Sequence, residues 1–330
     1  MTQDGQRGKK SVMSKSAIHR PPARYWPLKS GRYEVKPALQ RFGTEFGNGS
    51  ADHEVFQIDT QFELYRRTKM EARAVAMESH VLRQDYAESV AEAVNCFVAH
   101  RLVAEHSSWF ELRCSEDRRI LTCHLTGENL VFDLNWRLID SVVSDLVHPG
   151  YISGFDALAC QIQEDLAVTC LEADHNWLSA LHVCLPSHWA PNLKIGQSFA
   201  QVHKPVPDME PTTNRQHQFV DQMIGAVQGL VRFVWGVQRD GRLNGYPDGS
   251  LESGSGGACV RIERQTIWGL PEVNAALFTI RPYLVDLESV CRDPLRSTSL
   301  AEAVKDMSLK ALQYKGLELW KAELLQKLGG

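Results

Sequence analysis

The second half of the chain contains five short runs rich in β-branched and aromatic residues, a pattern typical of strands. Residues 173–177 are polar and short enough for a hairpin loop between the first two runs. Residues 240–257 hold six glycines and no apolar periodicity, which indicates a long loop between the third and fourth runs. We therefore expect one antiparallel sheet of five strands, at residues 165–172, 178–185, 230–238, 258–266 and 275–284.

The remaining apolar positions follow helical spacings. Between His80 and His106 they recur mainly every three, four or five residues, which predicts an amphipathic helix, and residues 33–127 as a whole read as mostly helical. A further helical pattern covers residues 216–229. The last fifty residues carry an apolar stripe that predicts C-terminal helices, formed by Leu309, Leu312, Leu317, Trp320, Leu324 and Leu328.

These patterns divide the chain into four segments. We expect a disordered basic tail over 1–27, an N-terminal helical or mixed layer over 28–160, a sheet core over 161–285 and C-terminal helices over 286–330. In the core, a hairpin is followed by a helical excursion and then by three more strands, which matches the topology of PAS domains. The predicted fold class is α+β: a PAS-like five-stranded antiparallel sheet with covering helices and helical elaborations at both ends. Ligands in that fold sit between the helices and the sheet.

Composition and charge narrow the function classes. The 330 residues are 43% hydrophobic and 23% charged, as in a folded protein, and no apolar run is long enough to span a membrane. The net charge is −4, but residues 1–32 carry eight Lys/Arg and one acid, so the remainder carries about −11. An acidic body argues against a nucleic-acid groove. The eight cysteines include no CxxC pair, and no apolar segment follows the basic N-terminus, so we expect reduced thiols and a cytoplasmic protein.

Two histidines are candidate metal ligands. His203 lies two residues before Pro205-Val206-Pro207, where the prolines hold the backbone extended and restrict the imidazole. A neutral imidazole held in this way suits an axial ligand of haem iron. The spacing alone favours a structural or surface role for His203 over the ligand role. His188 is the second candidate, although its neighbour Trp189 points to loop packing.

Two strands carry charged residues on one face. Strand alternation places Arg261, Glu263 and Gln265 together, so that Glu263 could hold a cationic amine and Arg261 could pair with a carboxylate such as a haem propionate. A solvated charge ladder on an edge strand is the alternative. In the preceding strand, Arg232 and Gly236 share a face opposite bulky side chains that include Trp235. Gly236 permits the close approach of a flat cofactor, or it marks a bulge.

No motif for a nucleophile elbow, a Walker loop, a zinc protease or a dinucleotide fold is present, so a nicotinamide or flavin reductant would act from another chain. The chain resembles the catalytic (alpha) subunit family of haem-dependent oxidative N-demethylases over about residues 28–320. The matching segments are 33–37, 56–59, Tyr65 with Lys69, Trp189 with Pro191 and Lys194, 203–207, Arg232 with Trp235, 261–266 and 277–281.

The resemblance implies haem b between sheet and helices, and a monooxygenase that oxidises a small methylated amine, such as dimethylamine, with dioxygen. Electrons would come from a separate reductase that carries FMN and a 2Fe-2S cluster and uses NADPH. His203 would bind the iron, and Arg232 and Glu263 would form the distal site. Further cofactor contacts are expected at Arg261, Gly236, Trp235 and Lys194.

The chain departs from the family pattern at two positions, which bears on the amine accepted. It has His188 where the family places Gly, and Val234 where the family places Asn. Two other functions stay open. One is a haem-binding PAS-type sensor or interaction protein without turnover, and the other is a scaffold without cofactor.

Overall fold

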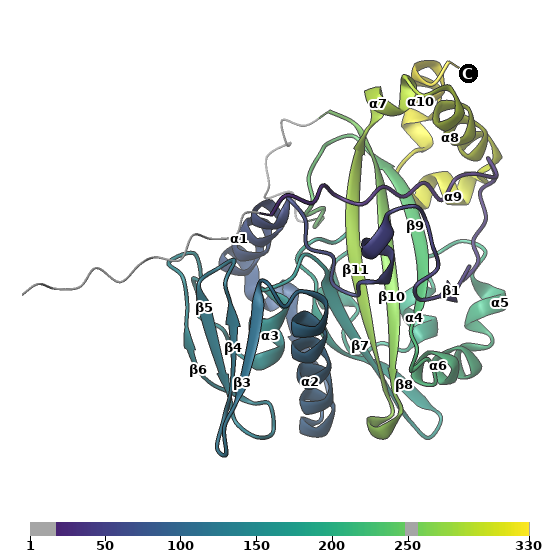
Figure 1. Cartoon of the computed structure of the whole chain (residues 1–330). Helices are drawn as coiled ribbons and strands as arrows, with labels where there is room; N and C mark the ends of the chain where they lie inside the picture. Colours follow the sequence, from purple (N-terminus) through teal and green to yellow (C-terminus); the bar gives the residue numbers. More distant parts are fainter. Residues whose placement is uncertain (1–17, 248–256, 330) are drawn as a thin grey trace, which may run out of the picture.

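A computed structural model describes residues 18–247 and 257–329, and it contains two antiparallel sheets (Figure 1). The larger sheet has seven strands in the order β1-β9-β10-β11-β7-β8-β2. Their bounds are β1 Gln40–Arg41, β2 Val81–Arg83, β7 Asp165–Glu172, β8 His175–His182, β9 Leu230–Gln238, β10 Cys259–Leu270 and β11 Ala275–Asp286. The four-stranded sheet is a meander of β3 Phe110–Cys114, β4 Arg119–Cys123, β5 Glu128–Phe132 and β6 Leu138–Val142.

The helices fall into three groups along the chain. The first group is α1 Phe62–His80, α2 Glu88–Glu105 and α3 Gly154–Ala159. The second is α4 Phe199–His203, α5 Glu210–Thr213 and α6 Gln216–Ile224. The third is α7 Leu287–Cys291, α8 Pro294–Asp306, α9 Leu309–Tyr314 and α10 Lys321–Lys327, with short 3-10 turns at Gly49–His53, Pro191–Leu193, Pro271–Val273 and Glu318–Trp320. No helix within the described ranges has both the length and the apolar content to cross a bilayer.

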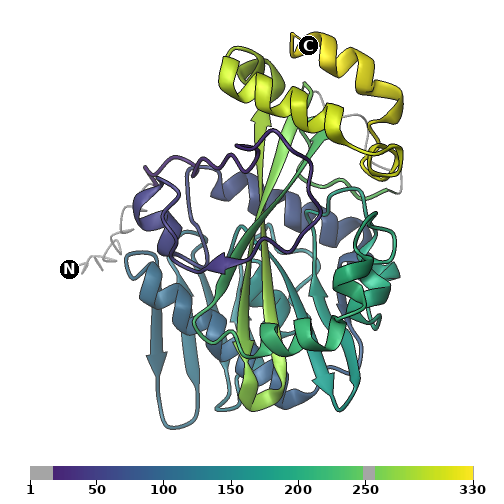
Figure 2. The ribbon, with the colours of Figure 1, turned by 90° about the vertical axis from the view of Figure 1, so that its right-hand side faces the viewer.

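The large sheet is covered differently on its two faces. Val220, Met223 and Ile224 of α6 pack against Ile267 and Ala276 on one face, which we name the α4–α6 face. The other face, named here the core face, packs against residues 54–59, α2, α3 and the small sheet. Figure 2 shows α4–α6 (green) on one side of the large sheet and the N-terminal segment (purple) on the other. The third helix group lies at the end of the sheet where β11 leads into α7 (Figure 1).

The predicted strands are confirmed, but the predicted five-stranded sheet is too small. The five runs correspond to β7 to β11, and the short strands β1 and β2 extend the sheet at its two edges. The hairpin loop was placed at 173–177, whereas β8 already begins at His175. The turn is this short because Ala173 adopts a left-handed backbone, with a φ of 50°.

The first half of the chain differs more from the prediction. A helix is present at Glu88–Glu105, but Val81–Arg83 forms β2 instead of continuing it. The helical interpretation of residues up to 127 was wrong for 110–123, which form β3 and β4 of the small sheet. Within the segment assigned to a disordered tail, residues 18–27 pack on the body, since Arg20 pairs with Glu54 and Tyr25 is buried. Residues 1–17, and 248–256 of the predicted long loop, lie outside the described residues.

Gly269 on β10 marks the point where α6 approaches the sheet most closely. A Cβ atom at this position would collide with the backbone carbonyl of Ile224. We therefore expect Gly269→Ala to displace the end of α6 and to lower the free energy of unfolding by roughly 1–3 kcal/mol in urea denaturation. Gly236→Ala is the matched control, because a Cβ there meets no heavy atom within 4 Å. Equal losses in the two variants would contradict this view of α6.

Candidate functional site

The α4–α6 face of the large sheet is incompletely covered by protein. Strand β11 pairs with β10 on one side and β7 on the other, so it lies inside the sheet. Phe278 and Ile280, whose side chains point to the α4–α6 face, are nevertheless only half-buried, whereas Leu277 and Thr279 on the core face are 0% exposed. Solvent therefore reaches the middle of this sheet face, and a ligand could cover it.

His203 is held at the last residue of α4 in one defined state. Its Nδ1 lies 2.8 Å from the carbonyl oxygen of Phe199, to which it donates, and its ring packs on the Phe199 ring with 4.2 Å between centroids. Burial, assisted by the nearby Arg232 charge, lowers the pKa of His203 to about 4. The imidazole is therefore neutral, and its Nε2 keeps a lone pair that has no hydrogen-bond partner in the described part of the chain.

Helix α4 is anchored at its N-terminus rather than by buried residues of its own. Ser198 and Gln201 form a reciprocal capping box. The Phe199 amide donates to Oδ1 of the buried Asn176 on β8, at 2.7 Å. Lys194 Nζ donates to the carbonyl of Val202 at 3.1 Å, and burial lowers the pKa of Lys194. These bonds fix the short helix, and with it His203, against the sheet.

Arg232 on β9 places a guanidinium without a hydrogen-bond partner on the same face. Its Nε is buried without a hydrogen-bond partner, and no hydrogen bond of its guanidinium to another described residue is present. Burial lowers the pKa of Arg232, and the Glu263 carboxylate partly opposes this effect. Arginine is seldom buried without a partner, so this guanidinium is suited to an anionic or strongly polar ligand.

Glu263 lies one strand away and is held by its neighbours. Arg261 Nε donates to Oε1 at 2.9 Å, and Gln265 Nε2 donates to Oε2 at 3.1 Å. The other Arg261 nitrogens donate to the carbonyls of Leu243 and Leu185. Arg261 therefore orients Glu263 and ties β10 to two loops.

Most of the predicted site residues converge, and one does not. Register pairs Arg261 with Gly236 and Gln265 with Arg232, so these residues and Glu263 share the α4–α6 face. Gly236 faces open space, because a Cβ there would touch nothing. Trp235 does not join them. Strand alternation turns its ring to the core face, where it packs edge-on against Tyr33 with 6.1 Å between centroids.

Two residues near the site were not predicted from the sequence. Lys315 follows α9, and its Nζ donates to the Trp235 carbonyl at 2.7 Å. Burial lowers the pKa of Lys315 to about 8, with Glu263 acting in the opposite direction. Burial also raises the pKa of Tyr314, as does the Glu263 charge.

His188, the second candidate ligand, is exposed on a loop with a φ of 56°.

In this α+β protein, an open sheet face therefore carries a neutral imidazole on its helical cover and a guanidinium without a hydrogen-bond partner on its strands. A family model described as haem-dependent oxidative N-demethylase, alpha subunit-like, matches residues 48–325. The chain belongs to this family, as the resemblance in the sequence predicted. The family description names haem and oxidative N-demethylation, which is oxidoreductase chemistry. The residues fit that group: His203 offers a free Nε2, Arg232 lacks a partner, and Gly236 leaves room for a flat ring.

The unpartnered state of Arg232 has a measurable consequence in haem-free protein. Arg232→Met is expected to leave the free energy of unfolding unchanged or higher, because it removes a largely desolvated charge that has no hydrogen bond or ion pair to a described residue. Arg281→Met is the matched comparison, since Arg281 pairs with Asp59 at 2.7 Å on the core face, and its loss should cost about 3–5 kcal/mol. Urea denaturation measures both. An equal loss in Arg232→Met would show that the protein itself holds this guanidinium.

Proposed function

We propose that this chain is the catalytic, haem-binding subunit of an oxidative N-demethylase, with haem b between α4 and the α4–α6 face of the sheet. The observation that carries the proposal is that two groups without hydrogen-bond partners, His203 Nε2 and the Arg232 guanidinium, lie at the same incompletely covered sheet face. The PAS-like description of the core is part of this proposal. It is supported by the chain order, in which the β7–β8 hairpin is followed by α4–α6 and then by β9, β10 and β11.

The substrate class we propose is a small methylated amine such as dimethylamine. Glu263 supplies a carboxylate for its ammonium group, and Arg261 and Gln265 keep the carboxylate oriented. Arg232 places positive charge where an oxygen ligand would gain electron density. The Phe199 carbonyl fixes the His203 tautomer, so that Nε2 would be the nitrogen available to hold haem iron.

Haem supplies dioxygen binding and the oxidation of a methyl C–H bond. In the overall reaction, the methylated amine, dioxygen, two electrons and two protons give an N-hydroxymethyl amine and water. The N-hydroxymethyl amine then breaks its C–N bond to release formaldehyde and the demethylated amine. The electrons have to be delivered from outside this chain, and we propose a separate reductase with FMN and a 2Fe-2S cluster that oxidises NADPH.

The test is formaldehyde release by the purified haem-loaded chain, supplied with dioxygen, dimethylamine and a reductase. We expect amine-dependent NADPH consumption with one formaldehyde per NADPH. In Glu263→Gln we expect a raised KM for the amine and an unchanged haem content, because the carboxylate holds substrate and not iron. Haem-loaded protein that is reduced normally but releases no formaldehyde from any methylated amine would overturn the enzyme proposal. A ligand-driven change in oligomeric state without product would then support a sensor.

A further inference from the structure

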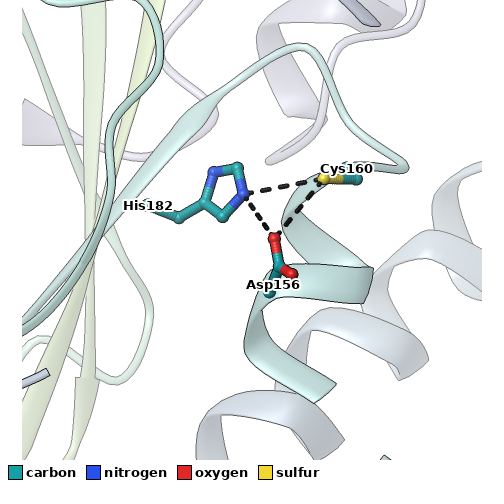
Figure 3. Close-up of side chains that lie close together, drawn as sticks. All are labelled: Asp156, Cys160 and His182. Atoms are coloured by element: carbon teal, nitrogen blue, oxygen red, sulfur yellow. Dashed lines mark hydrogen bonds and ion pairs between the residues drawn. The ribbon is translucent and has the colours of Figure 1, made fainter. Parts of the chain in front are cut away.

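A second cluster of reactive side chains lies behind the large sheet, on its core face. Asp156 lies on α3, and Cys160 is the C-cap residue one turn further along (Figure 3). His182 is the last residue of β8, where its register partner is Leu166. All three residues are 0% exposed. Because Leu166 and His182 point to the core face, this cluster is separated by the sheet from His203 and Arg232.

The three potential ligand atoms are spaced like the corners of a tetrahedron. Asp156 Oδ1 lies 3.1 Å from His182 Nε2, Cys160 Sγ lies 3.6 Å from the same nitrogen, and Sγ and Oδ1 are 3.8 Å apart. A tetrahedral Zn²⁺ ion with ordinary bond lengths would place its O, N and S ligands about 3.4, 3.6 and 3.6 Å apart in the same order. Figure 3 shows the three atoms pointing toward one another.

Neighbouring groups orient the Asp156 carboxylate and leave one hydrogen-bond acceptor direction of its Oδ1 unused by them. Arg73 donates to both Asp156 oxygens at 2.8 Å, and the Ile152 amide donates to Oδ2 at 3.0 Å. Oδ1 therefore has one remaining acceptor direction, toward His182 and Cys160. Ligating carboxylates and imidazoles in metal sites are held by outer hydrogen bonds of this kind. The second ring nitrogen of His182 faces Cys184 Sγ at 3.8 Å.

The protonation states expected for Asp156 and Cys160 do not by themselves require a bound metal ion. Burial opposes ionisation of Asp156, but its partners His182 and Arg73 lower its pKa to about 2. Burial raises the pKa of the Cys160 thiol to about 12, so the thiol keeps its proton unless a cation replaces it. A bare network and a metal site thus differ in one observable feature, which is whether Cys160 is a thiol or a metal-bound thiolate.

We propose that Asp156 Oδ1, Cys160 Sγ and His182 Nε2 bind a structural zinc ion that joins α3 to β8. A thiolate, an imidazole and a carboxylate form a donor set suited to Zn²⁺. On binding, the Cys160 thiol releases its proton to solvent, and the remaining N–H of His182 resides on Nδ1, which faces Cys184. A water molecule would complete the tetrahedron. Since the site is fully buried, the ion has to enter while the chain folds.

The first measurement is the zinc content of the full-length chain, purified without a metal-affinity tag and analysed by inductively coupled plasma mass spectrometry. We expect one zinc per chain in the wild type and a loss of at least about tenfold in Cys160→Ala. Cys170→Ala is the matched control, because Cys170 is also buried but lies outside the cluster. Equal zinc in wild type and Cys160→Ala would assign the metal to another place and overturn the proposal.

A second measurement does not depend on the stability of the variants. Wild-type protein is unfolded, stripped of metal and refolded with Co²⁺, and its absorption is recorded. A thiolate-to-cobalt charge-transfer band supports the site, and it should be absent after refolding with Mg²⁺, which avoids sulfur ligands. Refolded protein with native circular dichroism but without this band would overturn the proposal. Neither measurement requires haem, an amine or a reductase, so the result is independent of the proposed function.

Discussion

The His203→Ala variant is expected to retain its fold and lose most of its haem. His203 supplies the proposed iron ligand, while its ring contributes few contacts beyond Phe199 and α4 buries no residue of its own. Removal of an outer hydrogen-bond partner alone weakens metal binding about 10- to 100-fold, so loss of the ligand should weaken haem affinity by at least about 100-fold. Haem titration followed by visible absorption measures this effect.

The control for this variant is His217→Ala. His217 is exposed on α6, within the same helical cover, and makes no predicted contact with the ligand. Its haem affinity and its far-ultraviolet circular dichroism should equal those of the wild type. Haem affinity in His203→Ala within threefold of the wild type would contradict the assignment of the iron ligand, and His188→Ala would become the next variant to examine.

Glu128→Ala is expected to cause a large loss of stability. Glu128 on β5 pairs with Arg66 of α1, and their side chains are 0% and 2% exposed. It also accepts hydrogen bonds from Ser144, Tyr151 and Gln161. The substitution would leave a buried guanidinium without its ion pair, so the free energy of unfolding should fall by about 3–5 kcal/mol in urea.

The same pair predicts a pH dependence. Burial would raise the pKa of Glu128, but the Arg66 charge and the hydrogen bonds from Tyr151 and Gln161 outweigh burial and hold the pKa below its usual 4.5. The stabilisation is therefore complete above pH 4.5 and is lost as the pH falls through the lowered pKa. Wild-type stability should decline more steeply below pH 4.5 than that of Glu128→Ala. Glu111→Ala, which breaks an exposed pair with Arg113, should change neither the stability nor its acid slope measurably.

Strands β7 to β11 of the large sheet were predictable because their residues are apolar on both faces or alternate clearly. β10 is buried along its whole length, and β-branched residues recur along it between the charged ones. The small sheet was not predicted because its strands are five residues long and include polar positions, as in Phe110–Cys114. Its pairing depends on contacts with α2 and α3 that no local pattern reveals.

The candidate site was partly predictable for a similar reason. Strand alternation already placed Arg232 with Gly236, and Arg261 with Glu263, on common faces, and it already placed Trp235 on the other face. The hydrogen bond that leaves His203 Nε2 free arises from the single turn of helix before it, and the backbone after His203, predicted to be extended, turns back through a helical Lys204. Lys315 reaches β9 from 80 residues away in the chain, and no local signal marks it. The cluster on the core face likewise needs His182 to be brought to α3 by the fold.

The most direct test of the haem assignment is the visible absorption spectrum of His203→Gly protein mixed with haem at a concentration high enough to overcome the weakened affinity, recorded before and after addition of imidazole. The account predicts that the Soret band of the variant differs from that of the wild type, and that free imidazole, entering the space left by the side chain, restores the wild-type spectrum. A His203→Gly spectrum identical to that of the wild type without imidazole would show that another residue binds the iron.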